Sequence, residues 1–260
     1  MRYALLLITL IPALAFAQDK NYSAAQLIAA MKAAKPSGGI YVRLRMEHRD
    51  AAGKQMVLQA QLKRRSTADG GSETLYQLLF PKERKGEALL LRVKGGSFSG
   101  TAFAPGQGSR ALKQSDRSSG IFGTALTVDD AIAEFLDWQQ QEITGKEKEG
   151  AVPCTVIESR APKSSSSDMT RVKSWIDETR LTAMKIEFYK KAAAPARTVL
   201  THKVLRGSSG YYAPSSFTVT DHATGASTKV EGVRSDKDIT YTDADFSDSA
   251  METISAPAAN

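Results

Sequence analysis

The clearest pattern along the chain is an alternation of apolar and charged residues in its first third. From Val42 to His48 every second residue faces one side of an extended strand, and the arginines and glutamate between them face the other side. The turn DAAGK leads into a second alternating stretch from Met56 to Leu62. These two segments predict an antiparallel hairpin with one apolar face and one solvated face.

Nine further segments have the composition of short strands separated by polar turns. They cover residues 74–80, 87–93, 97–103, 154–159, 170–177, 182–189, 198–205, 215–221 and 227–232. Together with the hairpin they give about eleven antiparallel strands, and a sheet of that size must curl into a barrel, a half-barrel or a sandwich. Helices do not alternate with the strands, which disfavours a doubly wound parallel sheet. We therefore expect a mainly β protein with a few helices.

The first predicted helix covers about residues 23–35. Ser23 and Gln26 have the spacing of a capping box, in which each side chain bonds the other residue's backbone amide. The sequence Pro36-Ser37-Gly38-Gly39 ends the helix. Its apolar stripe is narrow, so we expect it to lie against the sheet.

The second predicted helix covers about residues 128–141. Thr127 and Asp130 again have capping-box spacing, so the aspartates of its first turn already have a structural role. Its apolar face contains Val128, Ala131, Ile132, Phe135 and Leu136. Farther along, the serine-rich stretch 161–169 is expected to be a flexible loop.

The first 17 residues have the pattern of a signal peptide. Arg2 supplies the positive start, a short apolar run follows, and Ala15 and Ala17 form the small-residue cleavage site. Cleavage after Ala17 would leave a chain that starts at Gln18, where a lipoprotein would need a cysteine. The single cysteine, Cys154, lies in an alternating stretch and is expected to be a buried small side chain. We expect an exported periplasmic protein without a lipid anchor, with residues 18–260 forming one domain.

The composition narrows the classes of partner. The net charge is +7, and 42% of the residues are hydrophobic, which is ample for a core. Outside the cytoplasm a basic surface meets anionic lipid more readily than nucleic acid, and no aromatic and basic RNA-binding pattern is present. No later apolar run is long enough to span a membrane. We expect neither nucleic-acid binding nor a membrane-spanning segment.

Catalytic patterns are weak. The chain has no GxSxG, HExxH or phosphate-binding loop motif. His48, His202 and His222 lie far apart in the sequence, so solvated strand histidines are favoured over a metal site. A triad of Ser118, Asp129 and a histidine would lack an oxyanion loop. We therefore expect a protein that is not an enzyme and holds neither a metal nor a cofactor.

The order of several short motifs resembles the outer-membrane lipoprotein-sorting family, relatives of the periplasmic lipoprotein carrier LolA. The motifs are the turn with Asp50, Gly53 and Lys54, then Phe80, Pro81, Gly86, Leu89 and Leu90, then Phe122, Gly123, Thr124 and Asp130, then Trp175 and Asp177, then Met184–Tyr189, and finally SSFTVTDHATGASTKV and DADFS. The chain departs from the family at Thr101-Ala102-Phe103-Ala104-Pro105, where relatives often have W-x-Y-x-P.

The resemblance implies a strongly curved antiparallel sheet that forms an incomplete barrel, with helices covering its open side. It implies a hydrophobic cavity between the sheet and a lid built from residues 122–138. Arg43 and Arg45 are the candidates for a gating arginine, and Gly120 and Gly123 are candidate hinge positions. The residues expected to line the cavity are Leu44, Met46, Leu58, Leu62, Leu79, Leu90, Phe103, Phe122, Ile132, Phe135, Trp175 and Ile186. Where a strand is apolar on both sides, as at Leu89–Leu91, the residues could face the side of the sheet opposite to the one expected.

The function implied is that of a periplasmic carrier or chaperone for a lipid or for the acyl chains of a lipoprotein. Its partners would be the cargo and an inner-membrane transporter or outer-membrane acceptor. The alternative is an accessory or sensor protein of an envelope transporter or signalling system, which would use the same scaffold to bind protein.

Overall fold

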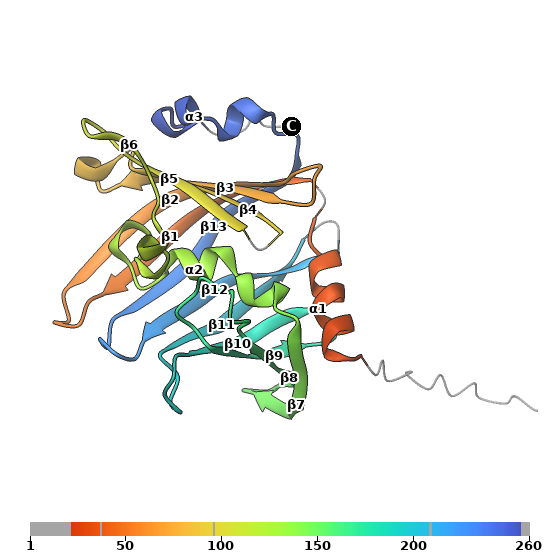
Figure 1. The fold of residues 1–260 in the computed structure, drawn as a ribbon. Helices are drawn as coiled ribbons and strands as arrows, with labels where there is room; N and C mark the ends of the chain where they lie inside the picture. The colour runs from red at the N-terminus through yellow and green to blue at the C-terminus, as the bar shows by residue number, and fades with distance from the viewer. Residues whose placement is uncertain (1–21, 37, 96, 208–209, 256–260) are drawn as a thin grey trace, which may run out of the picture.

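The computed structural model describes residues 22–36, 38–95, 97–207 and 210–255. The predicted signal peptide lies outside the described residues. Thirteen strands form one antiparallel sheet that does not close into a barrel (Figure 1). The expected mainly β fold with a strongly curved, incomplete barrel is therefore confirmed.

The elements follow one another simply along the chain. The strands are β1 (Gly39–Arg49), β2 (Gln55–Ser66), β3 (Ser72–Phe80), β4 (Ala88–Lys94), β5 (Ser97–Ala104), β6 (Gly108–Ala111), β7 (Gln140–Glu149), β8 (Val152–Arg160), β9 (Arg171–Asp177), β10 (Thr182–Tyr189), β11 (Arg197–Arg206), β12 (Tyr212–Asp221) and β13 (Ser227–Ile239). The α-helices are α1 (Ala24–Ala33), α2 (Val128–Ile132) and α3 (Asp248–Glu252), and the 3-10 helices are η1 (Lys82–Arg84), η2 (Gln114–Ser118), η3 (Ile121–Gly123), η4 (Glu134–Asp137) and η5 (Asp243–Phe246).

The strand order explains the shape. Strands β1 to β6 run outward from the middle of the sheet to one edge, and β7 to β13 run back from the opposite edge until β13 pairs with β1. The connection from β6 to β7 must therefore cross the whole sheet. Residues 112–139, which we call the crossing segment, make this connection over the concave face and contain α2 (Figure 1).

Two strands, β6 and β7, were not predicted. They are the two edge strands, and their side chains are almost all exposed, so they lack the apolar alternation that marks the other eleven. The predicted helix over 128–141 is also wrong in length. The α2 helix ends at Ile132 because Ala133 adopts a left-handed conformation with φ of 53°, and β7 already begins at Gln140.

The main core lies between the concave face and the first part of the crossing segment. Met46, Leu58 and Leu78 from the sheet pack against Ile121, Leu126 and Ile132 from the crossing segment. Thr228 of β13 adds a polar link, because its Oγ1 accepts a hydrogen bond from the Ala125 amide at 2.8 Å. This half of the concave face is filled.

The outer face is also covered near β3 and β4, by the C-terminal segment with η5 and α3 (Figure 1). Leu75 and Leu90 pack there against Phe246 and Met251. The side-chain amide of Gln77 donates hydrogen bonds to backbone carbonyls of this segment, including that of Ala250 at 2.9 Å. Because β4 is buried on both faces, its sequence is a continuous apolar run.

The crossing segment is tied to the sheet by a buried ion pair. Arg197 of β11 donates to Asp130 Oδ1 at 2.6 Å, and both side chains are about one-twentieth exposed. The other carboxylate oxygen accepts from the Thr127 amide at 2.8 Å, so one side chain caps α2 and holds it to the sheet. Burial raises the pKa of the Asp130 carboxyl, while Arg197 and the Thr127 hydrogen bonds oppose that rise.

A second ionic cluster joins the crossing segment to the loop before β9. Arg117 is 3% exposed and binds Asp129 and Glu134, whose remaining oxygens accept from Ser167 and Ser165. The serine-rich stretch 161–169, expected to be a flexible loop, is thus hydrogen-bonded into the structure.

We predict that Asp130→Asn lowers the free energy of unfolding by about 3–5 kcal/mol, because it leaves the Arg197 cation buried without its counter-ion. The asparagine side chain still offers an oxygen to the Thr127 amide, so the helix cap is kept. The loss of stability therefore measures the effect of breaking the ion pair. Urea unfolding of the variant measures it.

The matched control is the double variant Asp130→Asn with Arg197→Met, which removes both charges and keeps an unbranched side chain. It should regain at least half of the loss. A double variant as unstable as Asp130→Asn alone would show that the unpaired charge is not the cause.

Candidate functional site

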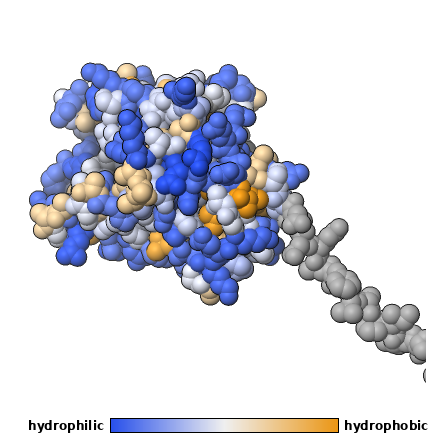
Figure 2. All heavy atoms as spheres, turned by 60° about the horizontal axis from the view of Figure 1, so that its bottom comes forward, coloured by the Kyte–Doolittle hydropathy of each residue, from blue (hydrophilic) through white to orange (hydrophobic). Residues whose placement is uncertain are grey.

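The second part of the crossing segment does not fill the concave face. Between it, α1 and strands β9 to β12 the structure leaves a cavity of about 270 Å³. This lies just below the range of about 300–1,000 Å³ that is usual for small-molecule sites. Figure 2 shows a mostly hydrophilic surface with a small group of strongly hydrophobic residues on the α1 side of the molecule.

The floor of the cavity is set by a β-bulge in β10. The register shifts between Ala183 and Lys185, so Ala183 and Ile186 both line the cavity, while Met184 packs with Trp175 in a separate cluster. Without the shifted residue the alternation of a strand would place Ala183 and Ile186 on opposite faces.

The roof comes from η4 of the crossing segment. Phe135 lines the cavity and meets Phe188 of the floor edge to face, with ring centroids 5.7 Å apart. Leu136 lines it beside Met31 of α1. Helix α1 packs through Leu27 and Ile28 on Ile157 and Ile176 of the sheet, which fixes one side wall.

Polar groups in the cavity are few. Ser174 is 3% exposed, and its hydroxyl has no hydrogen-bond partner among the described residues. Asp130 also lines the cavity, but Arg197 neutralises it. Lys32 and Lys35, at the end of α1, line its outer part. Loss of hydration, together with the nearby Arg64 and Lys32 cations, lowers the pKa of Lys35 to about 8.

A gap in the sheet adjoins this cavity. The pairing of β12 with β13 stops at Ser216 and Glu231, and a hollow of about 570 Å³ lies between the strands beyond that point. Tyr211 and Pro214 line both spaces. The cavity and the gap therefore share a wall.

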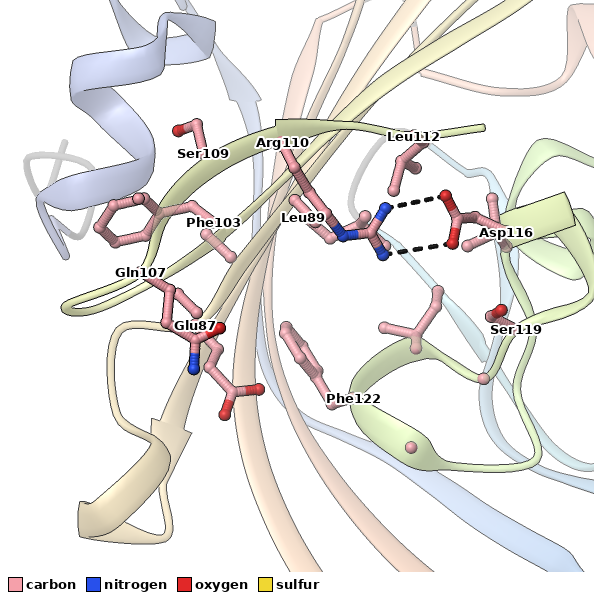
Figure 3. Close-up of a pocket in the computed structure, with 18 residues that line it drawn as sticks. Glu87, Leu89, Phe103, Gln107, Ser109, Arg110, Leu112, Asp116, Ser119 and Phe122 are labelled. Atoms are coloured by element: carbon pink, nitrogen blue, oxygen red, sulfur yellow. Dashed lines mark hydrogen bonds and ion pairs between the residues drawn. The ribbon is translucent and has the colours of Figure 1, made fainter. Parts of the chain in front are cut away.

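A third pocket, of about 310 Å³, lies between the β5–β6 hairpin and the start of the crossing segment (Figure 3). Its polar lining includes Glu87 and Gln107, and Arg110 holds Asp116 through two hydrogen bonds of 2.8 and 3.2 Å. Because its charged side chains already have ion-pair partners, Asp116 for Arg110 and Arg84 for Glu87, it is a weaker candidate for a ligand site.

The structure divides the residues predicted to line the cavity into separate groups. Phe135 and Ile186 line the cavity under the crossing segment. Phe103 and Phe122 line the polar third pocket. The others that face the concave side belong to the filled core or pack against it, namely Leu44, Met46, Leu58, Leu62 and Ile132.

Two residues do not face the concave side as expected, and a third lies at a bulge. Leu90 packs under the C-terminal segment, and Trp175 packs with Cys154 and Val156 on the outer face. Leu79 lies next to a bulge, and Leu78 takes the core position instead. The expected facing of Leu90 and Trp175 is wrong, because a strand that is buried on both faces has no apolar alternation from which the facing can be predicted.

The candidate gating arginines also differ from the expectation. Arg43 donates to the Tyr41 hydroxyl, and Arg45 pairs with Glu47 on the same strand. Besides Arg110 at Asp116, the crossing segment is bound by Arg197 of β11, at Asp130, and by Arg84 of η1, at the Phe122 carbonyl, at 3.2 Å. No residue pattern in the sequence indicated that Arg197 or Arg84 would bind the crossing segment.

Gly120 and Gly123 lie in a tight hydrogen-bonded turn at the start of the crossing segment. A β-carbon at Gly120 would lie 1.8 Å from the Thr124 carbonyl oxygen, so this position requires glycine for close packing. Gly123 has φ of 76°, which favours glycine. Their role as hinges stays a prediction.

The residues considered for catalysis are held in other contacts. Asp129 binds Arg117 and Ser167, and the Ser118 hydroxyl donates to the Ser115 carbonyl. Each histidine ring bonds a threonine on a neighbouring strand. Among the described residues no group of three or more histidine, cysteine or acidic side chains could hold a metal ion. In the same part of the chain, no helix has the length and hydropathy to cross a bilayer.

Three solved structures resemble this fold over most of its length. A domain assigned to outer-membrane lipoprotein sorting, from Vibrio parahaemolyticus, superposes with a TM-score of 0.81 at 18% identity, covering 88% of this chain and 98% of that chain. A DUF1329 family protein from Desulfovibrio piger gives 0.82 at 16% identity, covering 88% and 97%. A LolA superfamily protein from Nitrosomonas europaea gives 0.66 at 17% identity, covering 87% and 98%.

No curated protein sequence matches the chain. A family model with the description "-like: Uncharacterized protein" matches residues 70–253, which is more than half of the chain. The chain therefore belongs to the family of that model, and its fold is that of the LolA-like lipoprotein-sorting proteins.

Proposed function

We propose that this protein is a periplasmic carrier that binds an acyl chain, of a lipid or of a lipoprotein, in the cavity under the crossing segment. The observation that carries the proposal is the apolar cavity between the sheet, α1 and the crossing segment. Similar folds occur in proteins assigned to lipoprotein sorting, which supports a role in sorting lipids or lipoproteins to the outer membrane.

The size of the cavity is consistent with reversible binding. An engineered apolar cavity of about 150 Å³ holds one six-carbon benzene molecule, so about 270 Å³ holds roughly eleven carbons. Burying that many methylenes contributes about 9 kcal/mol before the costs of association. Those costs are several kcal/mol, which leaves an affinity weak enough for release. A carrier must release its cargo, so this balance suits the proposed role.

The first prediction is that the protein purified from its own periplasm carries a bound lipid or acylated peptide. Native mass spectrometry followed by lipid extraction would detect the added mass and identify its class. A protein without added mass that also fails to take up 1-dodecanol or dodecanoate would contradict the carrier role. That result would favour the alternative, an accessory protein that binds an envelope transporter or signalling protein.

The second prediction concerns the floor of the cavity. Ala183→Leu adds three carbons inside the cavity and should weaken dodecanol binding at least about tenfold, with little change in the free energy of unfolding. The matched control is Ala60→Leu, at a fully buried alanine in the filled core, which should cost about 1–3 kcal/mol of stability through overpacking.

Binding can be followed by the fluorescence of Trp138, one of two tryptophans in the chain, which packs against Phe135. A Trp175→Phe background removes the other signal, and Trp175 lies on the outer face, so the substitution should leave the affinity unchanged. Equal dodecanol affinity in the Ala183→Leu variant would show that the chain binds elsewhere.

A further inference from the structure

We propose that the ligand of this cavity has one acyl chain and an acidic head group, a carboxylate or a phosphate, held at the cavity mouth by Lys35 and Lys32, with the charge of Arg64 nearby. The proposal rests on the proposed acyl-chain binding and adds the chemical class of the ligand. It follows from the size of the cavity and from the charges at its mouth.

The size of the cavity limits the number of chains. Space for roughly eleven carbons accommodates most of a single twelve-carbon chain but not two. Phe135 and Phe188 are in contact across the cavity, and this contact restricts its width. A ligand with several chains would have to leave most of them outside.

The charges at the mouth are unbalanced. Lys32 and Lys35 line the cavity, and Lys32 pairs with Asp137 of the crossing segment. Arg64 follows Leu62 on the concave side of β2, and its charge acts on both Lys35 and Tyr211, which also lines the cavity. Within the described residues neither Lys35 nor Arg64 has an ion-pair partner. Lys35 therefore lines an apolar cavity without an ion-pair partner in the part of the chain that the structure describes, and the nearby Arg64 adds a second positive charge.

Loss of hydration is the main cause of the lowered pKa of Lys35, and the neighbouring positive charges add to it. The charged groups that act on it are Arg64 and Lys32, which lower the pKa, and Asp137, which raises it. A bound anion would stabilise the protonated amine. Because the pKa is about 8, Lys35 attracts an anion below that pH and loses its charge as the pH rises above it.

The other polar groups do not account for a preference for acids. The Ser174 hydroxyl can bond an alcohol as well as an acid, because it carries no charge. Asp130 would repel an anion, but Arg197 balances it. A cation near the last turn of a helix also offsets the helix dipole. Lys32 lies in that turn and serves this purpose, whereas Lys35 lies beyond the helix end and Arg64 comes from the sheet.

The experiment compares ligands with the same twelve-carbon chain. Dissociation constants for dodecanoate, dodecyl phosphate and 1-dodecanol are measured at pH 7 by calorimetry on the chain from Gln18. At least one of the two anions should bind about tenfold more tightly than the alcohol, equivalent to about 1.4 kcal/mol. If only one anion shows the preference, its head group identifies the source of the ligand.

The pH dependence isolates Lys35. Raising the pH from 7 to 9.5 should reduce the preference for dodecanoate, since Lys35 loses its charge while the carboxylate stays ionised. Lys35→Gln should reduce the preference at pH 7 to a similar extent, without changing dodecanol affinity. Lys35→Arg should keep the preference and lose the pH dependence, because arginine stays charged.

Two further variants serve as controls. Lys54→Gln removes an exposed charge at the β1–β2 turn and should change no affinity. Ser174→Ala removes an uncharged hydroxyl inside the cavity and should leave the preference for the anions over the alcohol unchanged. Equal binding of acid, phosphate and alcohol by the wild type, or an unchanged preference in Lys35→Gln, would overturn the head-group proposal and leave acyl-chain binding intact. Failure of all three ligands to bind would contradict the proposed function itself.

Discussion

The structure depends on one topological constraint. The sixth strand lies at one edge of the sheet and the seventh at the other, so the connection between them must cross the concave face. An unclosed sheet of this size exposes an apolar inner face that its own strands cannot cover, and the crossing segment covers it. The same connection therefore completes the core over one half of the sheet and forms the roof of a cavity over the other half.

The difference between the two halves arises where α2 ends. In a continuous helix Ile132, Phe135 and Leu136 would share one face and pack into one cluster. The left-handed conformation of Ala133 separates them, so Ile132 joins the filled core while Phe135 reaches the Phe188 side of the sheet. The buried pair of Asp130 and Arg197 holds the segment to the sheet close to this break. A change in the backbone of one residue thus separates the core from the cavity.

The sequence was informative where one face of an element is solvated. The alternation in β1 and β2 predicted their hairpin, and both capping boxes occur as expected at Ser23 and Thr127. It was uninformative where a strand is exposed on both faces, as in β7, or buried on both, as in β4, because neither produces alternation. The fold class was therefore predictable, whereas the facing of Leu90 and Trp175 was not, because both lie on strands that are buried on both faces. Arg197 could not be found for a similar reason, since its partner lies 67 positions away.

The floor of the cavity explains why the space stays open. Over the filled half the sheet presents large side chains such as Met46, Leu58 and Leu78, whereas β9 to β11 place the small Ser174, Ala183 and Thr201 among larger residues such as Ile186. Small residues opposite a roof that is fixed by ion pairs leave a volume that the protein cannot close by relaxation. The Ser174 hydroxyl, which has no hydrogen-bond partner in the described part of the chain, adds a cost of about 1–3 kcal/mol that an alanine would avoid. A core built only for stability would have filled this volume and removed that hydroxyl, so the arrangement favours a space used for binding over an imperfectly packed core.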